Sequence, residues 1–433
     1  MRQKLSVLLP AAVLFAFVFS PTFLFSQDFG FGEEEGALSA SIGTFAVSLS
    51  GKAGMEALGY VKDTMGDSSF DGGFRGRLNF EAQGANAKGI INLNVKAPDP
   101  NKDFFLSINE AYLQAYFGDF EIEGGIRKLT WGKADSMGPL DVINPYDYRS
   151  FTNLADSMEL KIAQPMIHAS YRISSFTKIE AVALPWFSPH RFAEGGRWAV
   201  FPLPIENPSD MDTLKYAQAG ARFTTTIGPV DIGAQYFYGR MYQPAVSGFI
   251  AGGSPPVPAM SVDYNRYHQA GVDYAQVIAG FNVRTEFGAN ITNDTAGDDG
   301  AVYNPSLVWS LGFDRDLFWG INLNLQCNES IRLMDDKVGD NPQIDTEAGS
   351  EITGTRITAV LSKKFLRDEL ETRITGIVGV EDKDFLIVPG IYWTIQDIGL
   401  ELSAGVFGGD KDGQLGQNHS NSFVKVGLMY TFY

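Results

Sequence analysis

Segments of about ten residues in which apolar and polar side chains alternate recur along the chain, and this pattern constrains the fold most strongly. In the first clear example, Phe74, Leu78 and Phe80 fall on one face, and charged or amide side chains fall on the other. Successive side chains of a β-strand point to opposite faces, so the alternation predicts strands with one apolar and one polar face. The same alternation recurs in residues 91–96, 279–287 and 319–328.

Alternation alone is also compatible with a secreted β-sandwich, in which the apolar face of one sheet packs against a second sheet. The connections favour a membrane barrel, because short turns alternate with longer polar loops rich in Asp and Gly. Aromatic residues also recur near the segment ends, as in the interfacial girdles of barrels. Short turns are expected at residues 84–86, 118–119, 174–175, 228–229, 276–277, 315–316, 366–367 and 397–398.

These eight turns join sixteen strands, and a first strand near residues 45–61 and a last strand near residues 423–432 remain. We therefore predict an all-β, transmembrane, up-and-down antiparallel β-barrel of about 18 strands, with 16 as the alternative. The last strand ends in Phe432 and Tyr433, and it resembles the aromatic C-terminal signature of bacterial outer-membrane barrels. This resemblance implies a bacterial outer-membrane location, contact with outer-membrane lipid, and recognition of the last strand by the barrel assembly machinery.

The start of the chain predicts export. A basic beginning, an apolar run over residues 5–19 and a cleavage point after Ser26 are typical of a secretory signal peptide, predicted here as residues 1–26. We expect residues 27–44 to form a periplasmic lead-in or plug segment. Residues 45–433 are expected to form the outer-membrane barrel.

Composition excludes several other classes of protein. The formal net charge of −17 at pH 7 argues against nucleic-acid binding. Cys327 is the only cysteine, so an exported chain of this kind has no internal disulfide framework. After the signal peptide, no run of about 18 apolar residues predicts a membrane-spanning helix. The oligomeric state is left open.

The stretch from residue 125 to residue 151 begins as a strand and then departs from the strand pattern. Pro139 and Pro145 lack a backbone donor and restrict the residue before them, so neither suits a central strand. The whole connection covers roughly 35 residues, and connections above about 12–15 residues are usually functional or disordered. Because its aromatic and aliphatic side chains require burial, we expect an ordered loop, residues 130–165, folded into the barrel.

Side chains predicted to point inward carry charges of both signs. A barrel of about 16–18 strands is too wide for wall side chains to fill, so its interior holds water, a plug or folded loops. Charges of both signs would orient polar solutes and repel apolar ones, unless they are simply solvated or paired across strands. The candidate pore and constriction residues are Arg75, Arg77, Glu121, Glu123, Arg127, Trp131, Asp135, Asp141, Asn144, Asp147, Arg149, Arg284 and Glu286. For those in the loop, a structural tether and a solute contact are both open.

The same stretch resembles part of a known family. Arg127, Trp131-Gly132, Asp135, Asp141-Val142 and Asn144-Pro145 with Asp147 follow the pattern of a family of uncharacterised, porin-like bacterial outer-membrane β-barrels. The likeness covers residues 109–151, and elsewhere it is limited to barrel-like periodicity. It implies an outer-membrane barrel and leaves the substrate open.

No motif in the chain indicates catalysis. There is no Gly-x-Ser-x-Gly elbow, no phosphate-binding loop and no histidine pair at metal-ligand spacing. His168 falls on the inward face, where lining the lumen is favoured over pairing with a serine. Asp410 to Gly413 resembles half a calcium site without the later glutamate, which favours a solvated turn. We expect no enzyme activity, no catalytic residues, no metal and no cofactor.

The function favoured by these patterns is a porin-like passive channel for small polar solutes. A transporter of hydrophobic molecules is one alternative, and the aromatic residues between 187 and 200 would line its apolar pocket. A surface adhesin or structural barrel is another, in which the acidic loops act and the lumen is blocked. The identity of the solute, the ion selectivity and an open or plugged lumen do not follow from the sequence.

Overall fold

The computed structural model describes residues 38–42, 45–62, 69–97, 105–135, 137–252, 257–342 and 344–433. The predicted signal peptide lies outside the described residues, as do residues 27–37 of the predicted lead-in segment. No helix in the described part of the chain is long and apolar enough to cross a membrane.

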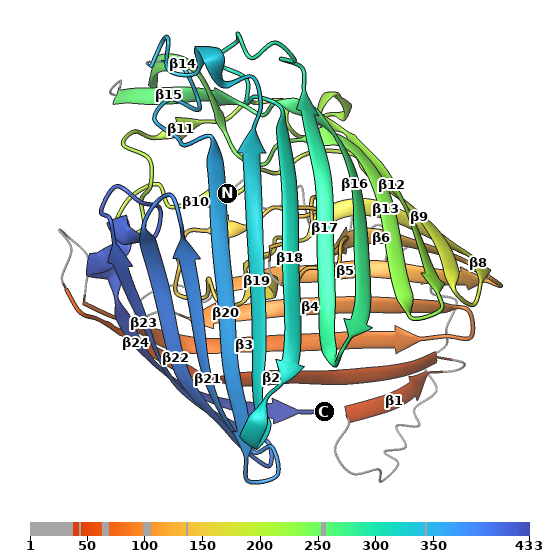
Figure 1. Cartoon of the computed structure of the whole chain (residues 1–433). Helices are drawn as coiled ribbons and strands as arrows, with labels where there is room; N and C mark the ends of the chain where they lie inside the picture. The colour runs from red at the N-terminus through yellow and green to blue at the C-terminus, as the bar shows by residue number, and fades with distance from the viewer. Residues whose placement is uncertain are drawn as a thin grey trace.

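Within the described residues, 18 antiparallel strands form one closed wall, because β2, the first of them, pairs with β24, the last. The predicted number of strands is confirmed. Figure 1 shows β16 to β20 in front and β3 to β5 crossing behind them at a steep angle, as expected for tilted barrel strands. The wall strands are β2 (Phe45–Tyr60), β3 (Phe70–Gln83), β4 (Ala87–Ala97), β5 (Phe105–Phe117), β6 (Phe120–Arg127), β8 (Gln164–Ser174), β9 (Thr177–Leu184), β12 (Gln218–Ile227), β13 (Val230–Arg240), β16 (Arg266–Ile278), β17 (Phe281–Thr292), β18 (Ser306–Asp316), β19 (Ile321–Arg332), β20 (Thr353–Phe365), β21 (Leu370–Gly379), β22 (Asp384–Ile395), β23 (Ile398–Gly409) and β24 (Phe423–Phe432).

Short connections join the strands at one end of the barrel, and each of the eight predicted turns corresponds to one of them. The β16–β17 turn lies at Ala279-Gly280, after the predicted residues 276–277, and the β18–β19 turn lies at residues 317–320 rather than 315–316. Ala279 and Gly280 have φ angles of 53° and 81°, the left-handed conformation of a tight hairpin turn. The apolar residues before this turn continue the strand, which is why the sequence places the turn too early.

The longer connections carry short elements of their own. A small sheet of β11, β14 and β15 lies at the upper end of the barrel in Figure 1, opposite the short turns. Strands β7 and β10 form a separate parallel pair. These elements are β7 (Asp147–Tyr148), α2 (Ser157–Leu160), β10 (Arg191–Phe192), β11 (Ile205–Glu206), η1 (Leu214–Tyr216), β14 (Ala245–Gly252), β15 (Val257–Asp263), η2 (Phe318–Gly320), η3 (Asp335–Lys337) and η4 (Gly416–Asn421).

Part of the predicted lead-in segment is a strand. Strand β1 (Leu38–Ile42) pairs antiparallel with the first residues of β2, from Leu49 back to Phe45. Strand β24 pairs with β2 only from Gly51 onward, so β1 occupies the part of that edge that β24 does not reach.

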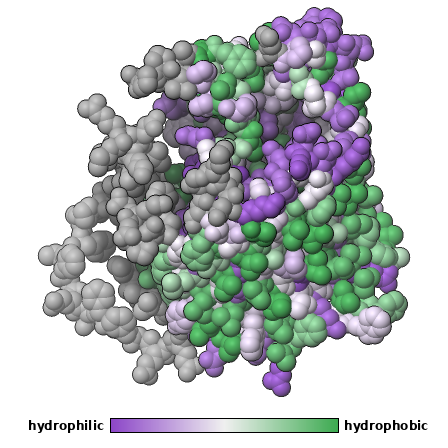
Figure 2. All heavy atoms as spheres, turned by 90° about the vertical axis from the view of Figure 1, so that its left-hand side faces the viewer, coloured by the Kyte–Doolittle hydropathy of each residue, from purple (hydrophilic) through white to green (hydrophobic). Residues whose placement is uncertain are grey.

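The outward face of the wall is apolar. Along β24, Val424, Val426, Leu428 and Tyr430 are each between 48% and 53% exposed, whereas the intervening Lys425 points inward and is half-buried. Figure 2 shows hydrophobic side chains gathered over the lower part of one face, with hydrophilic side chains above them. An apolar surface of this extent requires contact with hydrocarbon.

We expect Val426→Arg to destabilise the barrel by about 2–4 kcal/mol, because it would place a charge in the middle of the lipid-facing surface. Thr358→Arg is the matched control on the inner face of β20, where we expect a change below about 1 kcal/mol. Denaturant unfolding of both variants in phospholipid bilayers measures the difference. Equal effects of the two substitutions would contradict a lipid-facing outer surface.

Candidate functional site

The connection between β6 and β8, residues 128–163, contacts the inward-facing side chains of several wall strands; it is called the inner segment below. Gln235 of β13 donates a hydrogen bond to the carbonyl of Leu140 over 2.8 Å, and Gln269 of β16 donates to the carbonyl of Pro139 over 3.0 Å. Both glutamines are buried, while the outward-facing Val272 of β16 is about half exposed. The inner segment therefore packs against the polar face of the wall.

Glu286 of β17 is the central wall contact of the inner segment. Its carboxylate accepts hydrogen bonds from three backbone N–H groups, those of Lys133, Ala134 (2.7 Å) and Leu140 (3.1 Å). Glu286 is only 1% exposed. A buried carboxylate is stable when several donors satisfy it, and a nest of backbone N–H groups provides them. The inner segment therefore supplies the solvation that water would otherwise give to Glu286.

Two glycines allow this close approach. Gly132 has a φ of 93°, a backbone conformation that residues with a side chain rarely adopt, and a Cβ there would overlap Oε1 of Glu286. A Cβ at Gly138 would lie 2.8 Å from Oε2 of the same carboxylate. The glycine that follows Trp131 is thus required by a contact with a strand far away in the sequence.

A second polar contact joins the inner segment to β17, β18 and β19. The carboxylate of Asp135 pairs with Arg284 and accepts a hydrogen bond from Asn324 over 2.7 Å. Arg284 also pairs with Asp314 of β18. Among the predicted site residues, Asp135, Arg284 and Glu286 are therefore brought together by the fold.

Asn144 has a structural role. Its side-chain oxygen accepts from the N–H of Leu129 (2.7 Å), and its side-chain amide donates to the carbonyls of Arg127 (3.1 Å) and Ile162 (2.9 Å). Asn144 is 1% exposed. These three bonds tie the middle of the inner segment to the end of β6 and the approach to β8.

The side chain of Asp141 is also buried. Lys161 Nζ lies 2.6 Å from Oδ2 of Asp141, and the Tyr146 hydroxyl donates to the same oxygen over 3.0 Å. Burial raises the pKa of Asp141, and the neighbouring Lys161 ammonium opposes this rise. Trp131 is likewise buried, against Ile143 and other apolar residues.

Asp147 and Arg149 pair with each other, and Arg149 is largely exposed. Burial raises the pKa of Asp147, but the hydrogen bond and charge of Arg149 outweigh it, so the pKa lies below its ordinary value. Between them, Tyr148 stacks on Phe192 with ring centroids 5.8 Å apart.

A continuous group of aromatic rings joins the inner segment to the β9–β12 connection. Trp198 contacts Phe151 of the inner segment at 5.6 Å and Phe407 of β23 at 5.8 Å between ring centroids. Phe187 stacks on Tyr242 at 5.4 Å with an interplanar angle of 6°. The aromatic residues that suggested an apolar ligand pocket are therefore packed against other side chains.

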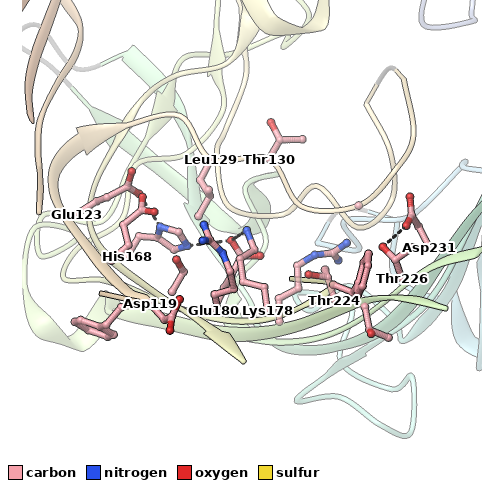
Figure 3. Close-up of a pocket in the computed structure, with 18 of the residues that line it drawn as sticks. Asp119, Glu123, Leu129, Thr130, His168, Lys178, Glu180, Thr224, Thr226 and Asp231 are labelled. Carbon is pink, nitrogen blue, oxygen red and sulfur yellow. Dashed lines mark hydrogen bonds and ion pairs between the residues drawn. The ribbon is translucent and has the colours of Figure 1, made fainter. Parts of the chain in front are cut away.

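A polar cavity of about 660 Å³ lies on the inner faces of β6, β8, β9 and β12, towards the short turns. Figure 3 shows Leu129 and Thr130 of the inner segment above it and His168 and Glu180 below. His168 Nδ1 lies 2.7 Å from Glu123, and its Nε2 lies 3.3 Å from Glu180. Both ring nitrogens of His168 face carboxylates rather than a serine hydroxyl, so the arrangement does not form a nucleophile–base pair.

Other predicted site residues line this cavity or lie on β3. Arg127 pairs with Glu123, while Glu121 accepts a hydrogen bond from Gln114 of β5. Arg75 and Arg77 lie on β3, away from these contacts. The sequence analysis did not predict the contact between Glu123 and His168. The strand register could have indicated it, because the two residues are cross-strand partners. Within the described residues, no group of acidic, histidine or cysteine side chains could hold a metal ion.

The wall is closed, its outer face is apolar, and its inner face carries charges and amides. The chain is therefore a closed β-barrel of the membrane-spanning type. Comparison with models of known protein families and with curated protein sequences gives no match.

Solved porin structures resemble the chain in outline. The OmpF porin of Salmonella typhi, in a complex with daunomycin, aligns over 91% of this chain and 100% of its own, with 9% identity and a TM-score of 0.45. Two mutants of the Rh. blastica porin align over 89% of this chain and 100% of theirs, with 12% and 11% identity and TM-scores of 0.41 and 0.42.

We expect Glu286→Gln to loosen the inner segment, because the side-chain amide carries no charge and only one of its two polar atoms accepts hydrogen bonds. Losing charge-assisted bonds costs about 1.5–3 kcal/mol, which corresponds to roughly 10- to 100-fold faster amide exchange at Ala134 and Leu140. Glu121→Gln, on the same inner face but without a contact to the segment, is the control. Unchanged protection in Glu286→Gln would show that the segment is held elsewhere.

Acidification provides a second test. Burial lowers the pKa of His190 to about 3 from its ordinary 6.5, and its Nδ1 accepts the N–H of Tyr146 over 2.8 Å. The unfolded chain binds the proton more readily, so this contribution to stability is complete above pH 6.5 and falls as the pH drops towards 3. The loss is at most about 1.4 kcal/mol per pH unit.

The variant His190→Asn keeps an acceptor for Tyr146 but does not titrate. We expect thermal unfolding of the wild type to shift downward between pH 7 and pH 4 by more than that of the variant. Equal decreases of the unfolding temperature in both proteins would show that His190 does not cause the loss of stability at low pH.

Proposed function

We propose that the barrel is a passive conduit for small polar solutes and that the inner segment narrows it. The observation that carries this proposal is the exposure of Lys52 and Lys96, two charged residues on the inner faces of β2 and β4. Lys52 lies near the middle of β2, well inside the closed wall, so its exposed area requires water inside the barrel.

The contacts of the inner segment support an asymmetric passage. The segment is bonded to β13, β16, β17 and β19 through Gln235, Gln269, Glu286 and Asn324. On the opposite side its contact with β3 is a partly exposed ion pair, Arg77 with Glu159, at 3.0 Å. Near the loop end of the barrel, the segment also packs against β2 and β23 through a buried apolar cluster that includes Leu160, Leu58 and Phe407. Water and solutes would therefore pass between the segment and the turn-side part of the wall formed by β2 to β4, beside Lys52.

A transporter of hydrophobic molecules receives less support. The rings expected to line its pocket are occupied by mutual contacts, such as Phe187 with Tyr264 at 4.9 Å. An adhesin with a blocked lumen would require that the water around the exposed inner charges does not connect the two ends of the barrel. Conductance measurements separate an adhesin from a conduit.

Purified protein inserted into planar bilayers is expected to produce discrete conductance steps, and liposomes that contain it should swell in small sugars. A heat-unfolded sample, which has no closed wall, is the control. Sealed bilayers and unswollen liposomes would contradict the conduit and favour an adhesin or structural barrel.

Shortening the inner segment should enlarge the conductance. Arg127 and Gln164 are cross-strand partners, so a short Gly-Ser turn can replace residues 130–161 and close the β6–β8 hairpin. Circular dichroism in the strand region verifies that the shortened chain folds. Glu286→Gln, which releases the segment without deleting it, should increase current fluctuations rather than mean step size. A folded, shortened barrel with the wild-type conductance would mean that the inner segment does not narrow the path.

A further inference from the structure

We propose that the inner face of β2, β3 and β4 contains a binding site for small oxyanions, such as phosphates or carboxylates, and that the conduit therefore favours anionic solutes. The selectivity part of this inference rests on the proposed function. The site itself rests on the arrangement of four cations on adjacent strands.

The four cations form two like-charge cross-strand pairs. Lys52 of β2 is directly opposite Arg77 of β3, and Arg75 of β3 is directly opposite Lys96 of β4. Arg75 and Arg77 are two residues apart on one strand, so all four side chains share the inner face. The set is called the basic quartet below.

Like charges directly opposite each other destabilise a sheet, so this arrangement has a cost in folding free energy. A wall selected only for stability would place a carboxylate or an amide at one position of each pair, as β19 does opposite β18, where Asn324 faces Asp314. The exposure of Lys52 and Lys96 to water reduces the repulsion and leaves both ammonium groups accessible.

Carboxylates satisfy only half of the quartet. Arg75 pairs with Glu56 at 3.5 Å, and Arg77 pairs with Glu159 of α2 at 3.0 Å. Within the described residues, neither Lys52 nor Lys96 lies in an ion pair. Four cations against two carboxylates leave a net charge of +2 at this place on the wall.

Neighbouring charges reduce this excess without removing it. Glu56 is shared with Lys425 at 3.3 Å, which weakens its hold on Arg75. Asp71 attracts the ammonium group of Lys96, and Arg149 repels it. Lys425 is also paired with Glu401, and Arg149 is paired with Asp147, so neither of these cations adds to the excess. Lys128 adds a further cation near Arg77, with Glu110 nearby as a carboxylate. A small oxyanion between Lys52 and Lys96 would supply the missing negative charge.

The guanidinium groups favour oxyanions over halides. Arginine presents planar, paired donors that match carboxylate and phosphate oxygens, whereas lysine adds a mobile point charge. Arginine and lysine side chains that line a pore are a usual means of anion selection, and the basic quartet places four of them on one side of the barrel.

The test uses the full chain with Lys52→Gln and Lys96→Gln combined. Lys363→Gln is the matched control, because Lys363 lies on the outer face of β20 near Phe365 and its removal deletes the same charge. Since neither quartet lysine has an ion-pair partner among the described residues, the double variant should fold at least as well as the wild type.

The first measurement is the reversal potential in bilayers under a potassium chloride gradient. The wild type and the control should prefer anions, and the anion-to-cation permeability ratio should fall about two- to fivefold for each lysine removed, less at high salt. A cation preference in the wild type, or an unchanged ratio in the double variant, overturns the inference and leaves the conduit intact.

The second measurement is calorimetric titration of detergent-solubilised protein with inorganic phosphate, which does not depend on conduction. Affinity in the double variant should drop at least tenfold relative to the wild type and the control. If bilayers stay sealed but this loss is seen, the anion site stands and the conduit fails. Equal affinity in all three proteins, or no binding by the wild type, overturns the site.

Discussion

The interior of this barrel depends on one buried carboxylate and three backbone N–H groups. Where the inner segment covers Glu286, water cannot reach its carboxylate, and a buried carboxylate needs other hydrogen-bond donors. The backbone N–H groups of Lys133, Ala134 and Leu140 are those donors. In turn, a long connection inside a barrel must satisfy its own backbone groups. The carboxylate therefore satisfies buried N–H groups of the segment, and these N–H groups satisfy the carboxylate. This reciprocal hydrogen bonding fixes the position of the segment.

The wall could be predicted from the sequence almost completely, because strand periodicity is a local property. The strand from Phe423 to Phe432 was placed to the residue, and the orientation of Arg75 and Arg77 followed from their neighbours. The inner segment was much harder to predict. Leu140 and Glu286 are 146 residues apart, and nothing near either residue indicates that they are partners.

The roles of individual site residues were limited by the same separation. Asp135, Asp141 and Asn144 look alike in sequence as polar residues of one loop. The structure divides them into a wall contact shared with Arg284, a buried pair with Lys161, and an anchor for the ends of the segment. Lys52 was not singled out, because a lone lysine in an alternating strand has no local signal. Its significance comes from facing Arg77 on the adjacent strand β3.

The pairing of β2 with β24 has a consequence for biogenesis. Strands β2 and β24 are the first and last wall strands in chain order, so the ring cannot close until the last strand has been synthesised. Until then both edge strands of the growing sheet have unpaired backbone N–H and C=O groups, which can pair wrongly with other chains. Strand β1 covers only Phe45 to Leu49 of the leading edge strand, the part that β24 never reaches, so Gly51 to Tyr60 keep an open edge until the last strand arrives.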